Sequence, residues 1–260
     1  MGSKAIQGKL WGHRPQDWAT IQEKTGSDGY LYALDFLKLS ADDNLLDVGC
    51  GSGLFSSMAH EIGANIIGID ATEELITQAK LRAPAVTFLT GEMEELPFAD
   101  RSFNVVCGFN SFQYAANTKN ALAEANRVLK TGGKLVVMVW GNKEDCEAVT
   151  YLKAVGSLLP PPLPDAPGPF ALSENKMLGN ILQEVGFKVI NSADVPSIWD
   201  YPDMGTALKG LLSAGPAAKA IEHSGFEKVH ETILAAAQPY IQSNGHVIYK
   251  NKYRVVIAEK

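Results

Sequence analysis

The chain has 260 residues, of which 46% are hydrophobic and 20% are charged, and its net charge is −6 at neutral pH. These values are ordinary for a folded globular protein. The acidic balance disfavours a surface for nucleic acid or an anionic membrane, which would need clustered Lys and Arg. The sequence contains no run of about 18 apolar residues, so no membrane span is predicted. Three scattered cysteines without a C-x-x-C pair predict reduced thiols and a cytoplasmic location.

Residues 1–40 are expected to form a helical lid. They contain Trp11 and Trp18 on either side of His13, followed by a helical pattern of apolar residues. The two tryptophans can close over a pocket or anchor this segment against the core, because aromatic side chains serve both purposes. His13 is the candidate general base, since it lies in the lid and histidine titrates near neutral pH.

Strands and helices alternate between residues 44 and 140. Short runs rich in β-branched and aliphatic residues are separated by helical patterns. This alternation predicts βαβ units and a parallel sheet with helices on both faces. Such sheets bind ligands at the carboxyl ends of their strands. The expected strands are 45–48, 65–69, 85–89, 104–107 and 134–139.

The first expected strand ends in a carboxylate and a glycine turn, Asp47-Val48-Gly49-Cys50-Gly51-Ser52-Gly53. Glycine permits positive φ and close approach of a ligand, and the N-terminus of the following helix offers unpaired N–H groups. The spacing differs from a dinucleotide fingerprint because the third glycine comes one place early, at Gly53. Asp47 would repel phosphates and suits a ligand with positive charge.

Asp70 and Ala71 follow the second expected strand. A carboxylate at this position of a nucleotide-binding sheet can accept both ribose hydroxyls. Asp70 could instead cap the helix expected over 72–82, because aspartate is a favoured N-cap residue. The spacing from the glycine turn favours the ribose role.

The D-V-G-C-G-S-G sequence resembles the first motif of the class I S-adenosylmethionine (SAM)-dependent methyltransferases. SAM carries a sulfonium and an ammonium group, which agrees with a carboxylate at Asp47. The resemblance implies a Rossmann-like, seven-stranded, mostly parallel sheet with an antiparallel last strand. It also implies SAM as cofactor and S-adenosylhomocysteine as product. Within the family the chain looks closest to the type 11, ubiquinone-biosynthesis-like group acting on small molecules.

The same resemblance assigns roles after the third and fourth strands. Glu92 would pair with the adenine amino group, and the backbone of Met93 would contact the adenine ring. Glu92 stands where the family more often has Asp. The alternative for Glu92 is a solvated surface charge. Phe109 and Asn110 would flank the methionine part of SAM and offer backbone carbonyls to its ammonium group. The fourth-strand segment lacks the Asn/Asp-Pro-Pro-aromatic box of methyltransferases that act on DNA bases.

Four aromatic residues are candidate walls of a pocket for an apolar or aromatic substrate, with core packing as the alternative for each. They are Trp11, Trp18, Phe112 and Trp140.

Beyond residue 140, a helix is expected over 146–159. The proline-rich stretch that follows it, 160–169, is expected to frame the substrate cavity. Ser173 is expected to cap a helix that ends at Val185. Aspartates 194, 200 and 203 are too loosely spaced to indicate a metal site. The expected organisation is a lid (1–40), a SAM-binding core (41–195) with its sixth strand over 187–195, a helical cap (196–245) and a final strand (246–260).

Three functions agree with these patterns. The first is methyl transfer from SAM to a small molecule by in-line displacement. The second is a SAM-binding protein of the same fold with other chemistry, because fold alone does not determine function. The third is a nicotinamide-dependent oxidoreductase, which the glycine spacing disfavours. The sequence does not indicate the acceptor atom, the oligomeric state or a metal dependence.

Overall fold

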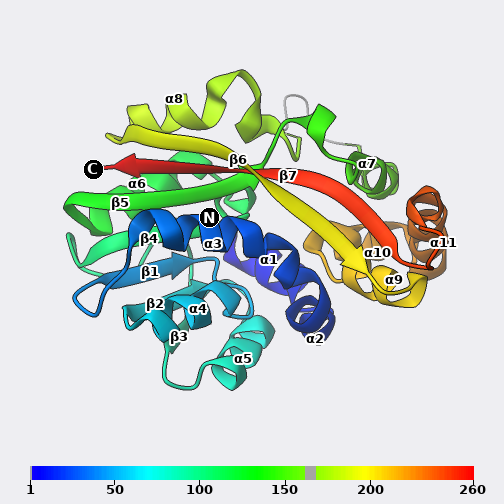
Figure 1. Ribbon diagram of the computed structural model, residues 1–260, viewed down its shortest axis with the longest axis horizontal. Coiled ribbons are helices and arrows are strands. Elements are labelled where there is room, and N and C mark those ends of the chain that lie inside the picture. Colours follow the sequence, from blue (N-terminus) through cyan, green and yellow to red (C-terminus); the bar gives the residue numbers. More distant parts are fainter. Residues whose placement is uncertain (1, 162–167) are drawn as a thin grey trace.

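The structure is a computed structural model that describes residues 2–161 and 168–260, without the side chain of Asn175. Seven strands form one sheet in the order β3-β2-β1-β4-β5-β7-β6 (Figure 1). β7 pairs antiparallel with both β5 and β6, and the other pairs are parallel. The predicted fold class, with its antiparallel last strand, is confirmed. The strands are β1 (Asn44–Val48), β2 (Asn65–Asp70), β3 (Thr87–Thr90), β4 (Phe103–Phe109), β5 (Leu129–Trp140), β6 (Lys188–Tyr201) and β7 (Val247–Glu259).

Helices cover both faces of the sheet because successive strand side chains point in opposite directions. In β1, for example, Leu45 belongs to the core cluster under α3, α4 and α5, whereas Leu46 belongs to the cluster under α6 and α8. The helices are α1 (Lys4–Trp11), α2 (Pro15–Asp17), α3 (Ser27–Leu37), α4 (Leu54–Ile62), α5 (Glu73–Arg82), α6 (Thr118–Val128), α7 (Val149–Gly156), α8 (Met177–Glu184), α9 (Met204–Leu212), α10 (Gly215–Ser224) and α11 (Phe226–Ala237).

The sixth strand is longer than predicted, whereas β7 lies within the range predicted for the final strand, 246–260. β6 continues to Tyr201, so the segment 196–201, expected to belong to the cap, is strand. Its side chains alternate between buried (Ser197, Trp199) and exposed (Ile198, Asp200), which is the period of a strand. The two strands pair from Lys188 and Glu259 to Tyr201 and Val247. Their far half therefore extends beyond the core and carries the cap helices α9, α10 and α11 (Figure 1).

Two helix predictions between residues 140 and 190 need correction. A 3₁₀ helix, Ala171–Lys176, precedes α8, and the Ser173 hydroxyl donates to the Trp140 carbonyl instead of capping a helix. The helix expected over 146–159 is the shorter α7. Of the proline-rich stretch, residues 162–167 lie outside the described residues, so the loop expected there is not described.

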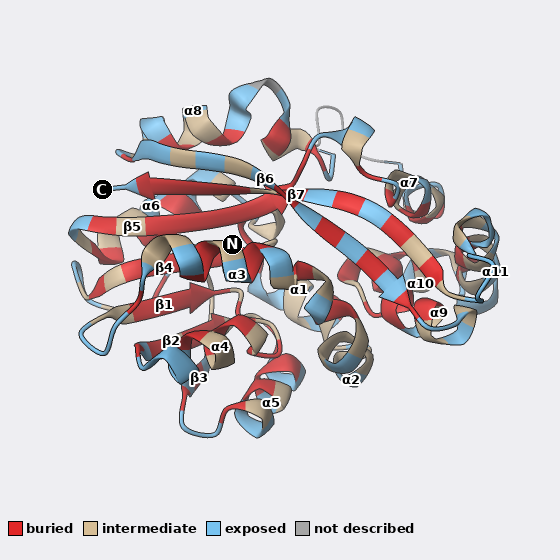
Figure 2. Cartoon of the chain, viewed as in Figure 1, coloured by how far each residue is buried: buried red, intermediate tan, exposed pale blue. Residues whose placement is uncertain are grey.

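The N-terminal segment, residues 4–26, crosses from the core to the cap. α1 contacts α10 of the cap, and α2 contacts α5 of the core. A π-helical turn, Trp18–Gln22, and a 3₁₀ helix, Glu23–Gly26, then lead into α3. The central strands β1, β4 and β5 are largely buried, whereas the edge strands β3 and β6 and the outer faces of the cap helices are largely exposed (Figure 2). In the described part of the chain, no helix has the length and apolarity needed to cross a bilayer.

Candidate functional site

A cavity of about 510 Å³ lies where the carboxyl ends of the parallel strands meet the N-terminal segment and the cap. Its volume is in the range of small-molecule and cofactor sites. One end is formed by the glycine turn and by residues that follow β2, β3 and β4. The other end is formed by β5, α7, α10 and the extended hairpin. Ten of the fifteen predicted site residues line it: Trp11, Trp18, Gly49, Gly51, Asp70, Ala71, Met93, Phe109, Asn110 and Trp140.

The glycine turn adopts a conformation that other residues rarely adopt. Gly49, Gly51 and Gly53 have φ values of +72°, +55° and +77°. The N–H groups of Gly49 and Cys50 both donate to the Ile69 carbonyl, which ties the turn to β2. Gly53 ends the turn as the N-cap of α4 and does not line the cavity, so it shapes the turn instead of touching a ligand.

Asp70 connects the turn to the next helix. Its Oδ2 accepts the Gly51 N–H at 2.9 Å and its Oδ1 accepts the Thr72 N–H at 2.8 Å. Burial raises the pKa of Asp70, although these two backbone N–H donors oppose the shift. Each carboxylate oxygen keeps an acceptor site beyond its backbone partner. The N-cap of α5 is Thr72, so Asp70 lies two positions before the N-cap of the helix that it was alternatively expected to cap.

Asp47 lies beneath the cavity instead of lining it. Its carboxylate is 1% exposed and accepts the Ser56 hydroxyl of α4 at 2.6 Å. Desolvation raises the pKa of Asp47 to about 7. The direct ligand contact expected for Asp47 is therefore replaced by a buried contact that joins β1 to α4.

Glu92 is directed toward the N-terminus of α1. Its Oε2 accepts the Lys4 N–H at 2.7 Å, and the Ser3 hydroxyl is 3.4 Å from Oε1. A carboxylate suits the unpaired N–H groups at this end of a helix. Glu92 does not line the cavity, whereas Met93 does. The Glu92 carboxylate, which was expected to contact adenine, instead accepts the Lys4 N–H and holds the N-terminal segment.

The segment after β4 supplies unpaired polar groups. Asn110 has a left-handed backbone (φ +52°), and its Oδ1 and the Oε1 of Gln113 are buried in the cavity wall without a hydrogen-bond partner among the described residues. Trp18 lines the same cavity, and its Nε1 is a buried donor that also lacks a partner within residues 2–161 and 168–260. Leaving such groups unpaired costs about 1–3 kcal/mol each, so a ligand with complementary groups would stabilise them.

The predicted aromatic walls are divided between the two ends of the cavity. Trp11 packs edge-on against Trp18 and Tyr114, with ring centroids 4.8 and 5.3 Å away. Trp140 packs against Phe170, Trp199 and Tyr253.

Phe112 and His13 need correction, because neither lines the cavity. Phe112 is 1% exposed and belongs to the core cluster under α6 and α8. The His13 side chain is 42% exposed, and its Nε2 is 3.6 Å from Oε1 of Glu222 on α10. His13 therefore joins the N-terminal segment to the cap on the outer surface.

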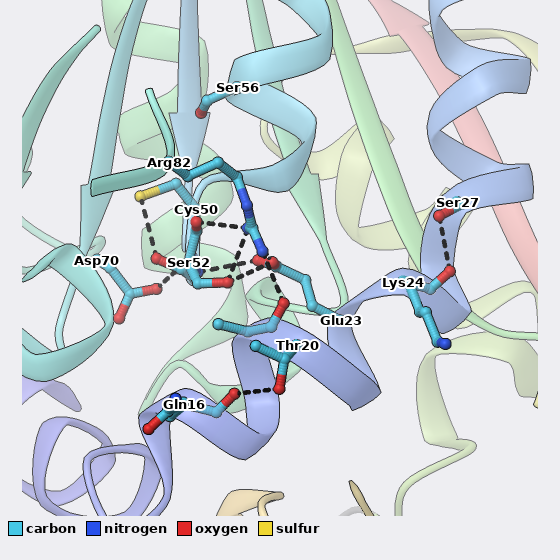
Figure 3. Close-up of polar contacts among 12 residues, drawn as sticks. Gln16, Thr20, Glu23, Lys24, Ser27, Cys50, Ser52, Ser56, Asp70 and Arg82 are labelled. Atoms are coloured by element: carbon cyan, nitrogen blue, oxygen red, sulfur yellow. Dashed lines mark hydrogen bonds and ion pairs between the residues drawn. The ribbon is translucent and has the colours of Figure 1, made fainter. Parts of the chain in front are cut away.

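A buried ion pair between Glu23 and Arg82 was not predicted from the sequence. Glu23 is 5% exposed, and its Oε1 accepts the Ser52 N–H at 2.9 Å, so it caps the glycine turn from the N-terminal segment (Figure 3). Its Oε2 accepts the Ser52 hydroxyl and an Arg82 N–H. Arg82 also donates to the Ala19 carbonyl at 2.7 Å. Burial raises the pKa of Glu23, and the charge of Arg82 opposes this.

Apart from Trp140, the wall at the cap end of the cavity was also not predicted. This wall includes Tyr151 and Val155 of α7, Trp199 of β6, Tyr253 of β7 and Lys219 of α10. The Tyr151 hydroxyl donates to the Leu211 carbonyl at 2.7 Å, and burial raises the pKa of Tyr253 to about 12. No spacing in the sequence brings these residues together, because the long hairpin and the cap place them.

The residues present fit a SAM-type ligand. Asp70 retains acceptor sites for ribose hydroxyls, and Ile69, Leu75 and Met93 give an apolar wall beside it. The unpaired Asn110 and Gln113 oxygens match an ammonium donor, and the unpaired Trp18 Nε1 matches a carboxylate acceptor.

The comparisons with known proteins agree with this geometry. Residues 46–137 match the type 11 family described as a methyltransferase domain. The chain is 29% identical over 182 residues to the O-methyltransferase cnsE of Penicillium expansum, a match that covers 65% of this chain and 63% of that enzyme. The chain spans less than two thirds of the length of this and the other first curated relatives.

Two solved structures show the same fold. A Bacillus halodurans C-125 protein has a TM-score of 0.62 and 17% identity, and the match covers 90% of this chain and 99% of that chain. The [4+2]-cyclase SpnF has a TM-score of 0.61 and 20% identity, and the match covers 93% of this chain and 84% of that chain.

Proposed function

Because residues 46–137 form a type 11 methyltransferase domain of the class I SAM-dependent family, we propose that the chain transfers a methyl group from SAM to a small molecule. The observation that carries the proposal is one continuous cavity with a polar end at the glycine turn and an aromatic end under the cap. A cofactor at the first end would present its reactive carbon toward the second. The net charge of −6 supports a small molecule over nucleic acid as the acceptor.

The polar end would hold the cofactor. Gly49 and Gly51 allow close approach of the ligand to the backbone, and Asp70 would accept the ribose hydroxyls. Asn110 and Gln113 would accept from the ammonium group, while Trp18 would donate to the carboxylate. SAM supplies a methyl group that is activated by its sulfonium.

The aromatic end would align the acceptor and exclude water. Positioning of reacting groups can account for about 7–11 kcal/mol of barrier reduction. Burial raises the pKa of Tyr151 and Tyr253, which makes both poor bases at neutral pH. No histidine lines the cavity within residues 2–161 and 168–260. This wall supports an acceptor that is already nucleophilic and needs no dedicated base.

The N-terminal segment would act as a lid over the cofactor. It contributes Trp11, Trp18 and Glu23 to the cavity and is held by Glu92 at α1 and by Arg82 at the glycine turn. Cofactor entry would require at least one of these contacts to open. The buried free thiols Cys50, Cys107 and Cys146 support a reducing compartment such as the cytoplasm.

Calorimetric titration with SAM and with S-adenosylhomocysteine tests the proposal. We expect both to bind, and absence of binding of either at millimolar concentration would overturn it. Trp18→Phe should weaken S-adenosylhomocysteine about five-fold, because it removes the unpaired N–H. Trp11→Phe is the matched control, since the Trp11 Nε1 donates to Gln7 at 3.2 Å within α1. Its effect should be smaller.

A second candidate is a SAM-binding protein that does not transfer methyl groups. The likeness to the [4+2]-cyclase SpnF supports it, because that protein has the same fold over 93% of this chain. Formation of S-adenosylhomocysteine with a panel of small phenols, thiols, amines and acids separates the two. SAM binding without S-adenosylhomocysteine formation would favour the second candidate. The match of residues 46–137 to a methyltransferase domain disfavours the nicotinamide-dependent alternative.

A further inference from the structure

The charges around the cavity are unevenly distributed. The two carboxylates in its wall, Glu23 and Asp70, both lie at the glycine turn, and Glu23 is paired with Arg82. Among the described residues that line the cavity, the only cationic side chain is Lys219 of α10. The wall around Tyr151, Val155 and Trp199 is aromatic and aliphatic. The positive charge therefore belongs to the cap end, where the acceptor would bind.

Lys219 lies at the mouth of the cavity. Its side chain is exposed, as is Gly156 of α7, which contacts α10 and also lines the cavity. Four residues before Lys219, Gly215 packs directly against the Trp11 indole, and a Cβ at Gly215 would be 2.7 Å from Nε1. This contact fixes the start of α10 against the N-terminal segment and keeps Lys219 at the mouth.

Lys219 has no acidic partner within 4 Å among the described residues. The nearest acid along α10, Glu222, is taken by Lys9 at 2.8 Å and lies 3.6 Å from His13. The N-terminal segment thus occupies the carboxylate that could have neutralised Lys219. Within the part of the chain that the structure describes, a positive charge without an acidic partner therefore remains at the entrance of the aromatic end of the cavity.

We infer that the acceptor is an amphiphile with an aromatic or aliphatic body and one anionic group, a carboxylate or a phosphate, that pairs with Lys219. The body occupies the wall of Tyr151, Val155 and Trp199, and the anionic group stays near solvent at α10. This rests on the proposed function, since it describes the acceptor half of the same cavity. Lys219 is a specificity residue and has no part in the methyl transfer itself.

The test compares two fluorescent probes that differ by one anionic group. 1-Anilinonaphthalene-8-sulfonate carries a sulfonate, and N-phenyl-1-naphthylamine has the same aromatic body without it. We expect Lys219→Gln to weaken the sulfonate probe about five-fold and the neutral probe by less than about two-fold. Lys219→Arg should retain the preference, and raising the salt concentration should reduce it only in proteins that keep the positive charge.

Lys228→Gln is the matched control, because Lys228 is an exposed cap lysine on α11 that does not line the cavity. Equal weakening of both probes by Lys219→Gln, an equal effect of Lys228→Gln, or no binding of either probe would overturn the inference.

A carboxylate and a phosphate ester of the same aryl body, used as competitors, identify the preferred anion. Calorimetry with S-adenosylhomocysteine on the same proteins separates the outcomes. If S-adenosylhomocysteine binds normally but the probe test fails, only the inference of an anionic acceptor is overturned. If the unsubstituted protein does not bind S-adenosylhomocysteine, the proposed function itself is overturned.

Discussion

The two ends of the cavity are built in different ways. At the glycine turn, the contacts are hydrogen bonds from backbone N–H groups to the carboxylates of Asp70 and Glu23. At the cap, they are ring contacts among Trp140, Trp199 and Tyr253. Backbone N–H groups define a fixed pattern of charge, whereas packed rings define a shape that substitution can alter. The polar end is therefore specified mainly by the short segments that follow the strands, and the aromatic end by tertiary packing.

The largest expected effect concerns the buried carboxylate below the polar end. Burial raises the pKa of Asp47 to about 7, so the folded protein binds a proton between pH 4 and 7 that the unfolded chain, with a pKa of about 3.9, releases. The contribution of Asp47 to the free energy of unfolding is fully present below the pKa of the unfolded state. It is lost as the pH rises to the folded-state pKa of about 7. Relative to Asp47→Asn, the free energy of unfolding should fall by about 4 kcal/mol over this range. Urea unfolding at several pH values measures it, and parallel pH curves for the two proteins would refute it.

Removing the cation of the buried ion pair gives the next effect. Arg82→Met should lower the free energy of unfolding by about 3 kcal/mol, because the buried Glu23 carboxylate loses its partner. The double variant Glu23→Gln/Arg82→Met should recover most of this loss. Lys119→Met breaks the exposed pair with Glu184 and should cost less than about 1 kcal/mol. If the two Met variants are equally stable in urea, the ion pair does not hold the lid.

Asp70→Ala should affect the polar end alone. It removes the acceptor of the Gly51 and Thr72 N–H groups and the expected ribose partner. We expect binding of S-adenosylhomocysteine to weaken about 100-fold in calorimetry. The control is Asp203→Ala, because Asp203 caps α9 through the Thr206 N–H at 2.8 Å and should cost only about 1 kcal/mol of stability. Comparable losses of nucleoside affinity in both variants would contradict the assignment.

The smallest effect is at the aromatic end. Tyr151→Phe removes the hydroxyl that donates to the Leu211 carbonyl and should cost about 1 kcal/mol of stability. Affinity for S-adenosylhomocysteine should stay within about two-fold, because the bond lies away from the glycine turn. Tyr32→Phe removes a hydroxyl bound to Asn191 outside the cavity and serves as the control. A large loss of nucleoside affinity in Tyr151→Phe would show that the two ends are coupled.

The sequence predicted most of the polar end, because its information is local. The glycine turn, Asp70 and Asn110 each follow a strand directly, and parallel strands bring their carboxyl ends together. Glu23 could not be predicted in the same way. It lies in a short polar stretch, Gln22-Glu23-Lys24, and only the fold brings it to Ser52, 29 positions away. His13 and Phe112 lie outside the cavity, because residue type alone does not distinguish a cavity wall from the outer surface or the core.

The hairpin of β6 and β7 has a mechanical consequence. β7 pairs with β5 from Lys134 and Glu259 to Trp140 and Tyr253, and with β6 over its whole length up to Val247. A ladder of backbone hydrogen bonds, with one register shift between Val189 and Asn191 of β6, therefore joins the centre of the sheet to the base of the cap. Bending the cap away from the core would strain this ladder. We therefore expect the opening motions of the cavity to occur in the N-terminal segment. Amide deuterium uptake should accordingly be slow along 247–257 and faster across 4–26.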